Sequence, residues 1–362
     1  MRTTTQQGGG IAACPAPSGT EALRPQGRKR INIALQGGGA HGAFAWGVLD
    51  RLLEDGRLHV EGICGTSAGA MNATVAAYGL YKGGREGARE ALARFWRKNS
   101  EAARTSPLQP TWLDQLISRG NMDFSPLWIF FDNLSRVMSP YQLNPLNLNP
   151  LRDLLLEVVD FEGLRRCTRV KLFLCASNVR SGRIKVFDTH EVSVDAVLAS
   201  ACLPFLFQAV EVDGEYYWDG GYMGNPPIYP LIYGTDVSDV LIIQINPINI
   251  PKVPTTAQEI MDRINTLSFN SSLMREMRAI HFVTRLIDDG VLDPARYKRI
   301  KLHTVHAEAE LGALGVSSKL NANWDFLRYL FDLGRERADA WLAGHFDKVG
   351  VESSTDIAAT FM

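Results

Sequence analysis

Residues 31–42 of this 362-residue chain read INIALQGGGAHG, and this stretch decides the fold. Its first five residues are apolar or β-branched for the most part, which predicts a short buried strand. Three glycines follow at 37–39, and residues 40–55 then repeat large apolar side chains along one helical stripe before Gly56. A strand that passes through a glycine loop into a helix is the opening unit of an α/β fold with a parallel sheet.

The same unit recurs immediately downstream. Residues 58–64 predict a second strand, GTSAG at 65–69 a tight turn, and 70–81 an alanine-rich buried helix. We therefore predict an α/β fold whose three-layer core has a mostly parallel sheet flanked by helices, with a helical C-terminal segment. The other predicted elements are hairpins at 169–187 and 208–218, a strand at 239–246, a helix at 255–289, a strand at 301–306 and a helix at 323–349.

Composition suggests three regions along the chain. Residues 1–29 are rich in Gly, Thr, Gln and Pro with more basic than acidic side chains, which predicts a disordered basic tail. Residues 30–250 form the main domain, and 251–362 are expected to be a mainly helical extension packed on the core. An insertion at about 105–150 carries six prolines and an aromatic cluster. It is either a lid or membrane-facing insertion, or an irregular cap packed on the domain.

Charge and cysteine usage exclude several protein classes. Lys+Arg number 38 and Asp+Glu 39, a balance that disfavours a nucleic-acid partner. The five cysteines are odd in number and lack metal-site spacing, so neither a disulfide framework nor a zinc site is expected. No apolar run is long enough to span a membrane, and the polar residues 3–10 cannot form a signal peptide's apolar region. A cytoplasmic location is the resulting expectation, and the oligomeric state is not indicated.

The first chemical motif is GGGAHG at 37–42. Its successive backbone N–H groups, placed at a helix N-terminus, can bind an anion or an oxyanion. The run also matches the G-x-G-x-x-G of dinucleotide-binding proteins, and it can equally be a close-packing turn. The dinucleotide interpretation requires a carboxylate near the end of the second strand, where this chain has Gly65, Thr66 and Ser67. An oxidoreductase is therefore the less favoured alternative.

The second motif, Gly65-Thr66-Ser67-Ala68-Gly69, matches the G-x-S-x-G nucleophile elbow. Small residues permit the strained turn, which exposes the serine hydroxyl at the start of a helix. By itself the match is common, and a helix N-cap serine explains it equally well. Its position is what gives it weight, because this turn and the 37–42 loop both follow parallel strands and should meet at one sheet edge.

The third motif is Asp219-Gly220-Gly221, directly after the second predicted hairpin. An isolated turn aspartate is the ordinary explanation of such a sequence. An α/β-hydrolase triad would also need a catalytic histidine after the serine. The downstream histidines fall in helical or strand-like stretches, where structural or exposed roles are expected: His190, His281, His303, His306 and His345.

In this order, GGGAHG, GTSAG and DGG resemble the patatin-like phospholipase family, and ASACLP at 199–204 resembles a stretch which that family carries before its aspartate. The resemblance spans roughly residues 31–246. It implies a Ser–Asp dyad without histidine, in which Ser67 is the nucleophile and Asp219 the base. It also implies an oxyanion hole built from the N–H groups of Gly37, Gly38 and Gly39. The motif-supporting glycines are Gly42, Gly65, Gly69, Gly220 and Gly221.

One position departs from the family pattern, because His41 stands where the family often has Arg or Lys. The resemblance implies a serine lipid acyl hydrolase whose substrate is a phospholipid or related lipid ester. A transacylase or polyester depolymerase would use the same dyad, and a catalytically inactive lipid-binding or scaffold protein is a further alternative. No calcium loop or ligand cluster is present in the sequence, so we expect no metal or other cofactor. Peripheral contact with a membrane, through the basic tail or the aromatic insertion, is left open.

Overall fold

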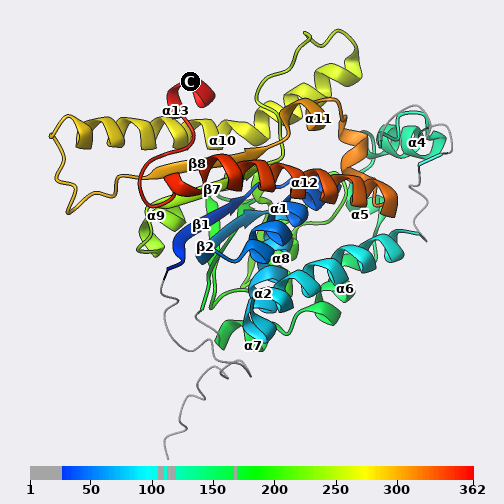
Figure 1. Ribbon diagram of the computed structural model, residues 1–362. Coiled ribbons are helices and arrows are strands. Elements are labelled where there is room, and N and C mark those ends of the chain that lie inside the picture. The colour runs from blue at the N-terminus through cyan, green and yellow to red at the C-terminus, as the bar shows by residue number, and fades with distance from the viewer. Residues whose placement is uncertain (1–26, 105–109, 112–113, 115–119, 167–168) are drawn as a thin grey trace, which may run out of the picture.

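The computed structural model describes residues 27–104, 110–111, 114, 120–166 and 169–362 (Figure 1). The predicted disordered tail therefore lies outside the described residues up to residue 26, as does part of the 105–150 insertion. Within the described ranges, no helix is both long and apolar enough to cross a membrane.

The centre of the molecule is an eight-stranded sheet with the order β5-β6-β3-β2-β1-β7-β8, in which β4 also pairs with β3. The four pairings that join β3, β2, β1, β7 and β8 are parallel, whereas β4 and β6 run antiparallel to β3. The strands are β1 Lys29–Leu35, β2 Leu58–Thr66, β3 Lys171–Asn178, β4 Ile184–Asp188, β5 Val210–Val212, β6 Glu215–Asp219, β7 Asp239–Gln244 and β8 Lys301–His306.

Helices cover both faces of this sheet. The main ones are α1 Gly42–Asp55, α2 Ala68–Ala103, α6 Pro150–Val158, α7 Phe161–Arg166, α8 Val194–Ser200, α9 Tyr229–Gly234, α10 Ala257–Asp288, α12 Trp324–His345 and α13 Ile357–Phe361. Shorter elements are α4 Pro126–Ser135, α5 Pro140–Leu143, α11 Glu308–Gly312 and the 3-10 turns η1 Gly39–His41, η2 Gly220–Tyr222, η3 Val316–Leu320 and η4 Phe346–Lys348. The helix predicted at 70–81 is the first part of α2, and non-helical backbone at Gly83 and Gly84 kinks α2 between this part and the second part, which runs to Ala103.

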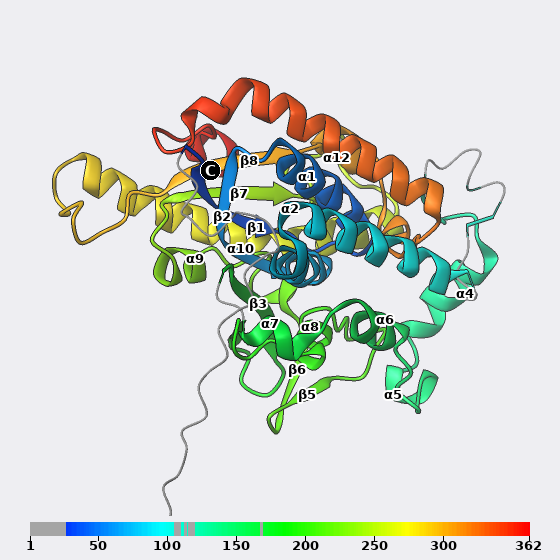
Figure 2. The ribbon, with the colours of Figure 1, turned by 60° about the horizontal axis from the view of Figure 1, so that its bottom comes forward.

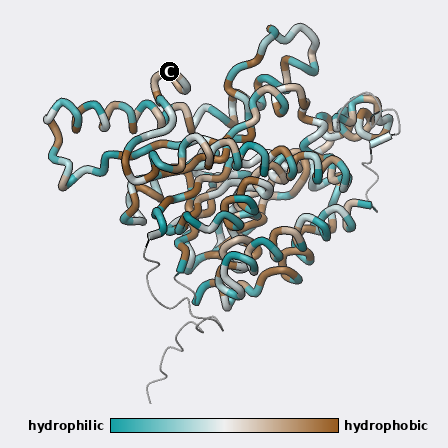
Figure 3. The backbone as a smooth tube through the Cα atoms, in the orientation of Figure 1, coloured by the Kyte–Doolittle hydropathy of each residue, from teal (hydrophilic) through white to brown (hydrophobic). Residues whose placement is uncertain are grey.

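Alternating side chains of the central strands separate two apolar cores. On β1, Ile33 and Leu35 pack in the core formed with α1, α2 and α12, whereas Ala34 packs in the core formed with α9, α10 and α13. The hydropathy colouring shows that hydrophobic residues are concentrated in the interior, between the sheet and the helices (Figure 3). The predicted three-layer α/β fold is thus confirmed.

The C-terminal segment is built into the fold. Its strand β8 pairs along its whole length with β7, from Lys301 opposite Asp239 to His306 opposite Gln244. Its helix α12 lies against α1 (Figure 2). The Trp46 ring of α1 and the Phe331 ring of α12 have centroids 4.1 Å apart. The last strand and the last long helix therefore complete the sheet and cover one of its faces.

Candidate active site

Ser67 lies in the turn between β2 and α2, in a conformation that few serines adopt. Its φ is 57° and its ψ is −124°, and its side chain is nearly buried. The turn is tied down because the Ser67 N–H donates to Ser200 Oγ at 3.0 Å and the Ser67 carbonyl accepts from Ala70 N at 2.9 Å. Backbone strain of this kind is found mainly where surrounding structure enforces it, often at functional sites.

Two glycines explain why this turn can form. A Cβ atom on Gly69 would lie 2.3 Å from the Leu35 carbonyl oxygen, because α2 starts directly against the end of β1. A Cβ atom on Gly37 would lie 2.6 Å from the Ser67 Cβ atom. The glycine loop and the serine turn are therefore in direct contact, as the parallel arrangement of β1 and β2 predicts.

The N–H groups of the glycine loop are not equivalent. The Gly37 N–H already donates to Asn225 Oδ1 at 2.6 Å, so an oxyanion at Gly37 would have to displace that acceptor. Gly38 and Gly39 line the cavity in front of Ser67, and their N–H groups have no acceptor among the described residues. Gly39, with φ of 59°, opens the turn η1 that leads into α1. Of the three predicted donors, Gly38 and Gly39 are the two that face the site.

A polar network beneath this loop was not predicted from the sequence. Gln36 Oε1 accepts from the N–H groups of Ile245 and Asn246, each at 2.8 Å, and the Asn246 amide donates to the Gly37 carbonyl at 2.8 Å. These side chains come from the ends of β1 and β7, and Asn225 comes from the loop after η2. Their effect is to fix the path of the glycine loop from below.

Asp219 ends β6 in a fully buried position. Its Oδ1 accepts from the Gly221 N–H at 2.7 Å, and its own N–H donates to the Cys202 carbonyl at 2.7 Å. Its Oδ2 is buried and accepts no hydrogen bond from the described residues. Burial raises the pKa of Asp219 to about 6, although the Gly221 N–H, the Ser67 hydroxyl and the Lys319 ammonium act to lower it. The Ser67 hydroxyl is thus close enough to the Asp219 carboxylate to lower its pKa, although no fully formed hydrogen bond joins the two side chains.

Strand register explains how residues so distant in sequence meet. On β3, Cys175 pairs with Thr66, the last residue of β2, and the next residue, Ala176, pairs with Asp219 on β6. β4 pairs with one side of β3 at these positions. On the other side of β3, β2 pairs as far as Cys175 and β6 pairs from Ala176 onward. Ser67, directly after the end of β2, and Asp219, at the end of β6, therefore lie next to each other along the same side of β3.

A cation reaches the site from the C-terminal segment. Lys319, in η3, lines the cavity beside Ser67, and its Nζ donates to Asn246 Oδ1 at 2.9 Å. Burial lowers the pKa of Lys319 to about 8, against the attraction of Asp262 and Asp219. Nothing local in the sequence around Lys319 indicates this position, because only the fold brings η3 beside η1.

His41, which the family pattern often replaces by Arg or Lys, carries no charge here. Burial lowers the pKa of His41 to about 3, and the positive charge of the nearby Lys319 contributes a smaller part of this shift. Its Nε2 lies 2.7 Å from Ser318 Oγ, whose hydroxyl donates to the Gly315 carbonyl at 2.6 Å, so Nε2 is the donor in this pair. His41 is therefore neutral, and the cation close to it is Lys319 from the C-terminal segment.

One downstream histidine does have the partners of a serine triad. His303 lies between Ser354 Oγ at 2.9 Å and Asp239 Oδ1 at 3.2 Å. However, Asp239 is the first residue of β7, whereas Ser67 follows the last residue of β2, and the strands between them are parallel. This cluster is thus at the opposite edge of the sheet, where it joins the 350–355 segment to β7 and β8.

The described residues contain no group of three or more His, Cys, Asp or Glu side chains arranged to hold a metal ion. Three of the cysteines, Cys64, Cys175 and Cys202, are buried free thiols. Burial raises the pKa of the Cys175 thiol well above its usual range, so this side chain stays a neutral thiol. The chemistry-bearing groups at this edge of the sheet are therefore a hydroxyl, a carboxylate, backbone amides and one ammonium.

Comparisons with known proteins find one matching family model and several similar solved structures. Residues 33–232, more than half of the chain, match the family model described as patatin-like phospholipase. A comparison with curated protein sequences finds no match. Among solved structures, VipD from Legionella pneumophila is similar at 16% identity and a TM-score of 0.41, covering 94% of this chain and 72% of that one. The type III effector ExoU is similar at 15% identity and a TM-score of 0.35, covering 89% of this chain and 53% of that one. ExoU in its complex with SpcU, from Pseudomonas aeruginosa, is similar at 15% identity and a TM-score of 0.37, with 90% and 52% covered. This chain thus spans about half the length of ExoU.

Proposed function

This chain belongs to the patatin-like phospholipase family, and on that premise we propose that it is a serine lipid acyl hydrolase in which Ser67 and Asp219 form the catalytic dyad. The observation that carries the proposal is the register of β3. It brings an unpartnered, buried carboxylate oxygen to the side of a serine held in a strained turn. Gly38 and Gly39 supply the oxyanion donors of the proposal, whereas the Gly37 N–H donates to Asn225 Oδ1.

The proposed reaction begins with removal of the Ser67 proton by Asp219. The hydroxyl oxygen attacks the ester carbonyl, and the resulting oxyanion receives hydrogen bonds from Gly38 and Gly39. The ester C–O bond then breaks, and Asp219 passes the proton to the departing alkoxide. In the second half, Asp219 removes a proton from water as the water oxygen attacks the acyl carbonyl. The bond to Ser67 Oγ then breaks, Asp219 returns the proton to this oxygen, and the fatty acid is released.

A desolvated carboxylate suits this task better than an exposed one. Burial raises the pKa of Asp219 to about 6, so the group remains ionised at neutral pH while holding a proton more strongly than an ordinary aspartate. An alkoxide leaving group needs less help from a general acid than an amine does, so esters are the expected substrates.

The first test is covalent labelling by a fluorophosphonate, which reacts with activated serines. Wild-type protein should be labelled and should hydrolyse p-nitrophenyl butyrate, and Ser67→Ala should abolish both. The matched control is Ser354→Ala, which removes the serine beside His303 and should retain both properties. Labelling that persists in Ser67→Ala but disappears in Ser354→Ala would assign the nucleophile to the other edge of the sheet.

We also propose that the protein takes its substrate from a lipid surface. Phe205 and Ile264 line the cavity in front of Ser67 and are 65% and 53% exposed, and Phe130 on α4 beside that cavity is 64% exposed. Apolar side chains gathered around the mouth of a site suit contact with a bilayer. Phe130→Asp should reduce cosedimentation with phosphatidylcholine vesicles several-fold, whereas Tyr233→Asp, at an exposed aromatic residue on α9, should not. Equal retention of both variants contradicts the proposal.

A further inference from the structure

Two adjoining cavities open onto Ser67. The first has a volume of about 380 Å³ and lies between α4 and α10. The second has a volume of about 390 Å³ and lies between α2 and α6. We call them the α10 cavity and the α2 cavity. Ser67, Gly39 and Lys319 belong to both linings, so the two cavities meet at the proposed nucleophile.

The α2 cavity is lined almost wholly by apolar side chains. Among its described lining residues, the polar ones besides Ser67 and Lys319 are two asparagines, Asn99 and Asn149. Its apolar wall comes from α2, α6 and the turn after α8, with Met71, Phe95, Trp96, Leu151, Leu154 and Phe207 as main members. A wall of this composition favours a ligand part that has no hydrogen-bonding groups.

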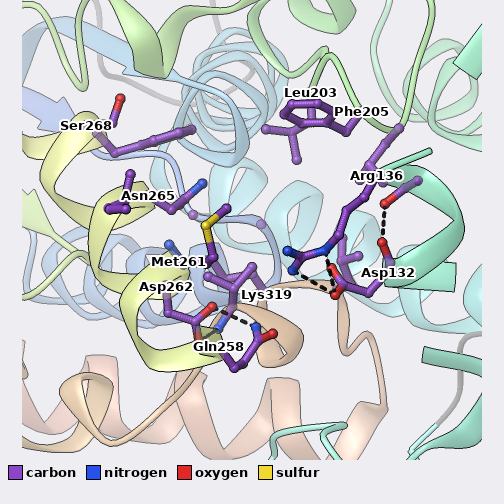
Figure 4. A pocket seen from close by; sticks show the side chains of 18 of the residues that line it. Asp132, Arg136, Leu203, Phe205, Gln258, Met261, Asp262, Asn265, Ser268 and Lys319 are labelled. Carbon is purple, nitrogen blue, oxygen red and sulfur yellow. Dashed lines mark hydrogen bonds and ion pairs between the residues drawn. The ribbon is translucent and has the colours of Figure 1, made fainter. Parts of the chain in front are cut away.

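The α10 cavity is also lined mainly by apolar surface, but its lining includes three charged side chains in addition to the shared Lys319. Asp132 and Arg136 of α4 form an ion pair at 2.9 Å on one side, and Gln258 donates to Asp262 of α10 at 2.9 Å on the other (Figure 4). Asn265 and Ser268 of α10 also line it. In Figure 4, Lys319 lies beside the Gln258–Asp262 pair. Charged and amide groups arranged along an otherwise apolar cleft suit the polar part of an amphipathic molecule.

From this difference we infer the direction in which the substrate lies. The α2 cavity binds the acyl chain that is transferred to Ser67, and the α10 cavity receives the alcohol part of the ester with its polar headgroup. A reversed placement would set methylene groups against the charged side chains of the α10 cavity, and it would offer the headgroup only Asn99, Asn149 and the shared Lys319 beside Ser67 as polar partners. The inference rests on the proposed function, because it assumes that Ser67 is the residue acylated. The inference identifies α2 and α6 as the elements that determine which acyl-chain lengths the site accepts.

The experiment uses two fluorophosphonates that differ only in the alkyl chain, one with a two-carbon and one with a sixteen-carbon chain. Attack by Ser67 Oγ on phosphorus releases fluoride and can be followed by intact-protein mass spectrometry. The measured quantity is the ratio of the long-chain to the short-chain labelling rate. Leu151→Trp and Asn99→Trp each place an indole into the α2 cavity from a half-buried position, so both are expected to fold.

Both variants should lower the long-to-short ratio by roughly tenfold or more, since filling an apolar site excludes methylene groups one after another. The matched control is Leu156→Trp, which makes the same change on the same helix at a side chain that is 54% exposed and lines neither cavity. Its ratio should equal that of the wild type. Ile264→Trp, in the α10 cavity, should leave the ratio within about twofold.

The possible outcomes distinguish a failure of the proposed function from a failure of the acyl-chain placement. If the wild type reacts with neither probe, or Ser67→Ala is still labelled, the proposed function is wrong and the inference falls with it. If the wild type is labelled at Ser67 but Ile264→Trp lowers the ratio while Leu151→Trp and Asn99→Trp do not, the acyl chain lies in the α10 cavity. That result overturns the inference and leaves the proposed function intact.

Discussion

Replacing Lys319 by Met should move the acid limb of the pH–activity profile to higher pH. Asp219 acts as a base only when it is ionised, and burial raises its pKa to about 6. The Lys319 ammonium opposes that rise, and with a pKa of about 8 it is charged throughout the range in which Asp219 titrates. Removing this cation therefore raises the pKa of Asp219 further and extends the inactive range toward neutrality.

The size of the wild-type effect follows from the pKa. A carboxyl group with a pKa of about 6 is about nine-tenths ionised at pH 7 and about one-tenth ionised at pH 5. If Asp219 is the base, kcat/KM should fall roughly tenfold between these two pH values. An aspartate with an ordinary pKa near 4 would lose only a small fraction of its activity over the same interval.

The assay is kcat/KM for p-nitrophenyl butyrate between pH 4.5 and 8.5 at constant ionic strength, with circular dichroism showing that the protein stays folded. Lys319→Arg is the matched control, because it keeps a positive charge and should keep the limb close to its wild-type position. A flat profile from pH 5 to pH 8, or a limb that Lys319→Met leaves in place, would refute the assignment of Asp219 as a base under the influence of this cation.

Two further predictions concern stability. Asp219→Asn should abolish turnover and also stabilise the protein at pH 7.5 by at most about 3 kcal/mol, because a carboxyl group with a folded-state pKa of about 6 instead of 3.8 destabilises the folded protein once it is ionised. Urea unfolding should show that this gain in the free energy of unfolding shrinks as the pH falls from 6 to 4. A gain that is independent of pH would contradict this cause. His303→Gln removes a buried ring that bonds both Asp239 and Ser354, so it should lower the free energy of unfolding by about 1–3 kcal/mol while keeping turnover within about twofold; an inactive but folded variant would restore a histidine to the mechanism.

The elements around Ser67 could be predicted from the sequence because their determinants are local. A β-branched run, a glycine loop and an amphipathic helix succeed each other within residues 31–55, and each imposes a short-range conformational preference. The hairpin before Asp219 was predictable for the same reason, since Asp213 and Gly214 adopt the positive φ values, 51° and 78°, that a two-residue turn requires.

The remaining parts of the site depend on contacts between distant segments. Lys319 reaches Asn246 only because η3 packs beside η1, and Asn225 reaches Gly37 across the sheet edge. Neither residue has a periodicity or spacing that would distinguish it from an ordinary surface lysine or loop asparagine. The break inside α2 at Gly83 and Gly84, whose backbone angles are not helical, was predictable because paired glycines ordinarily end a helix.

The position of η3 has a consequence for how this protein can be cut or recombined. A fragment limited to residues 33–232 would retain Ser67 and Asp219 but would end before β7 begins at Asp239. It would leave β1 as an unpaired edge, remove the helix that shields Trp46 and take away the ammonium beside the carboxylate. Both parts of the chain therefore contribute residues to the candidate site, and we expect neither part to form that site alone.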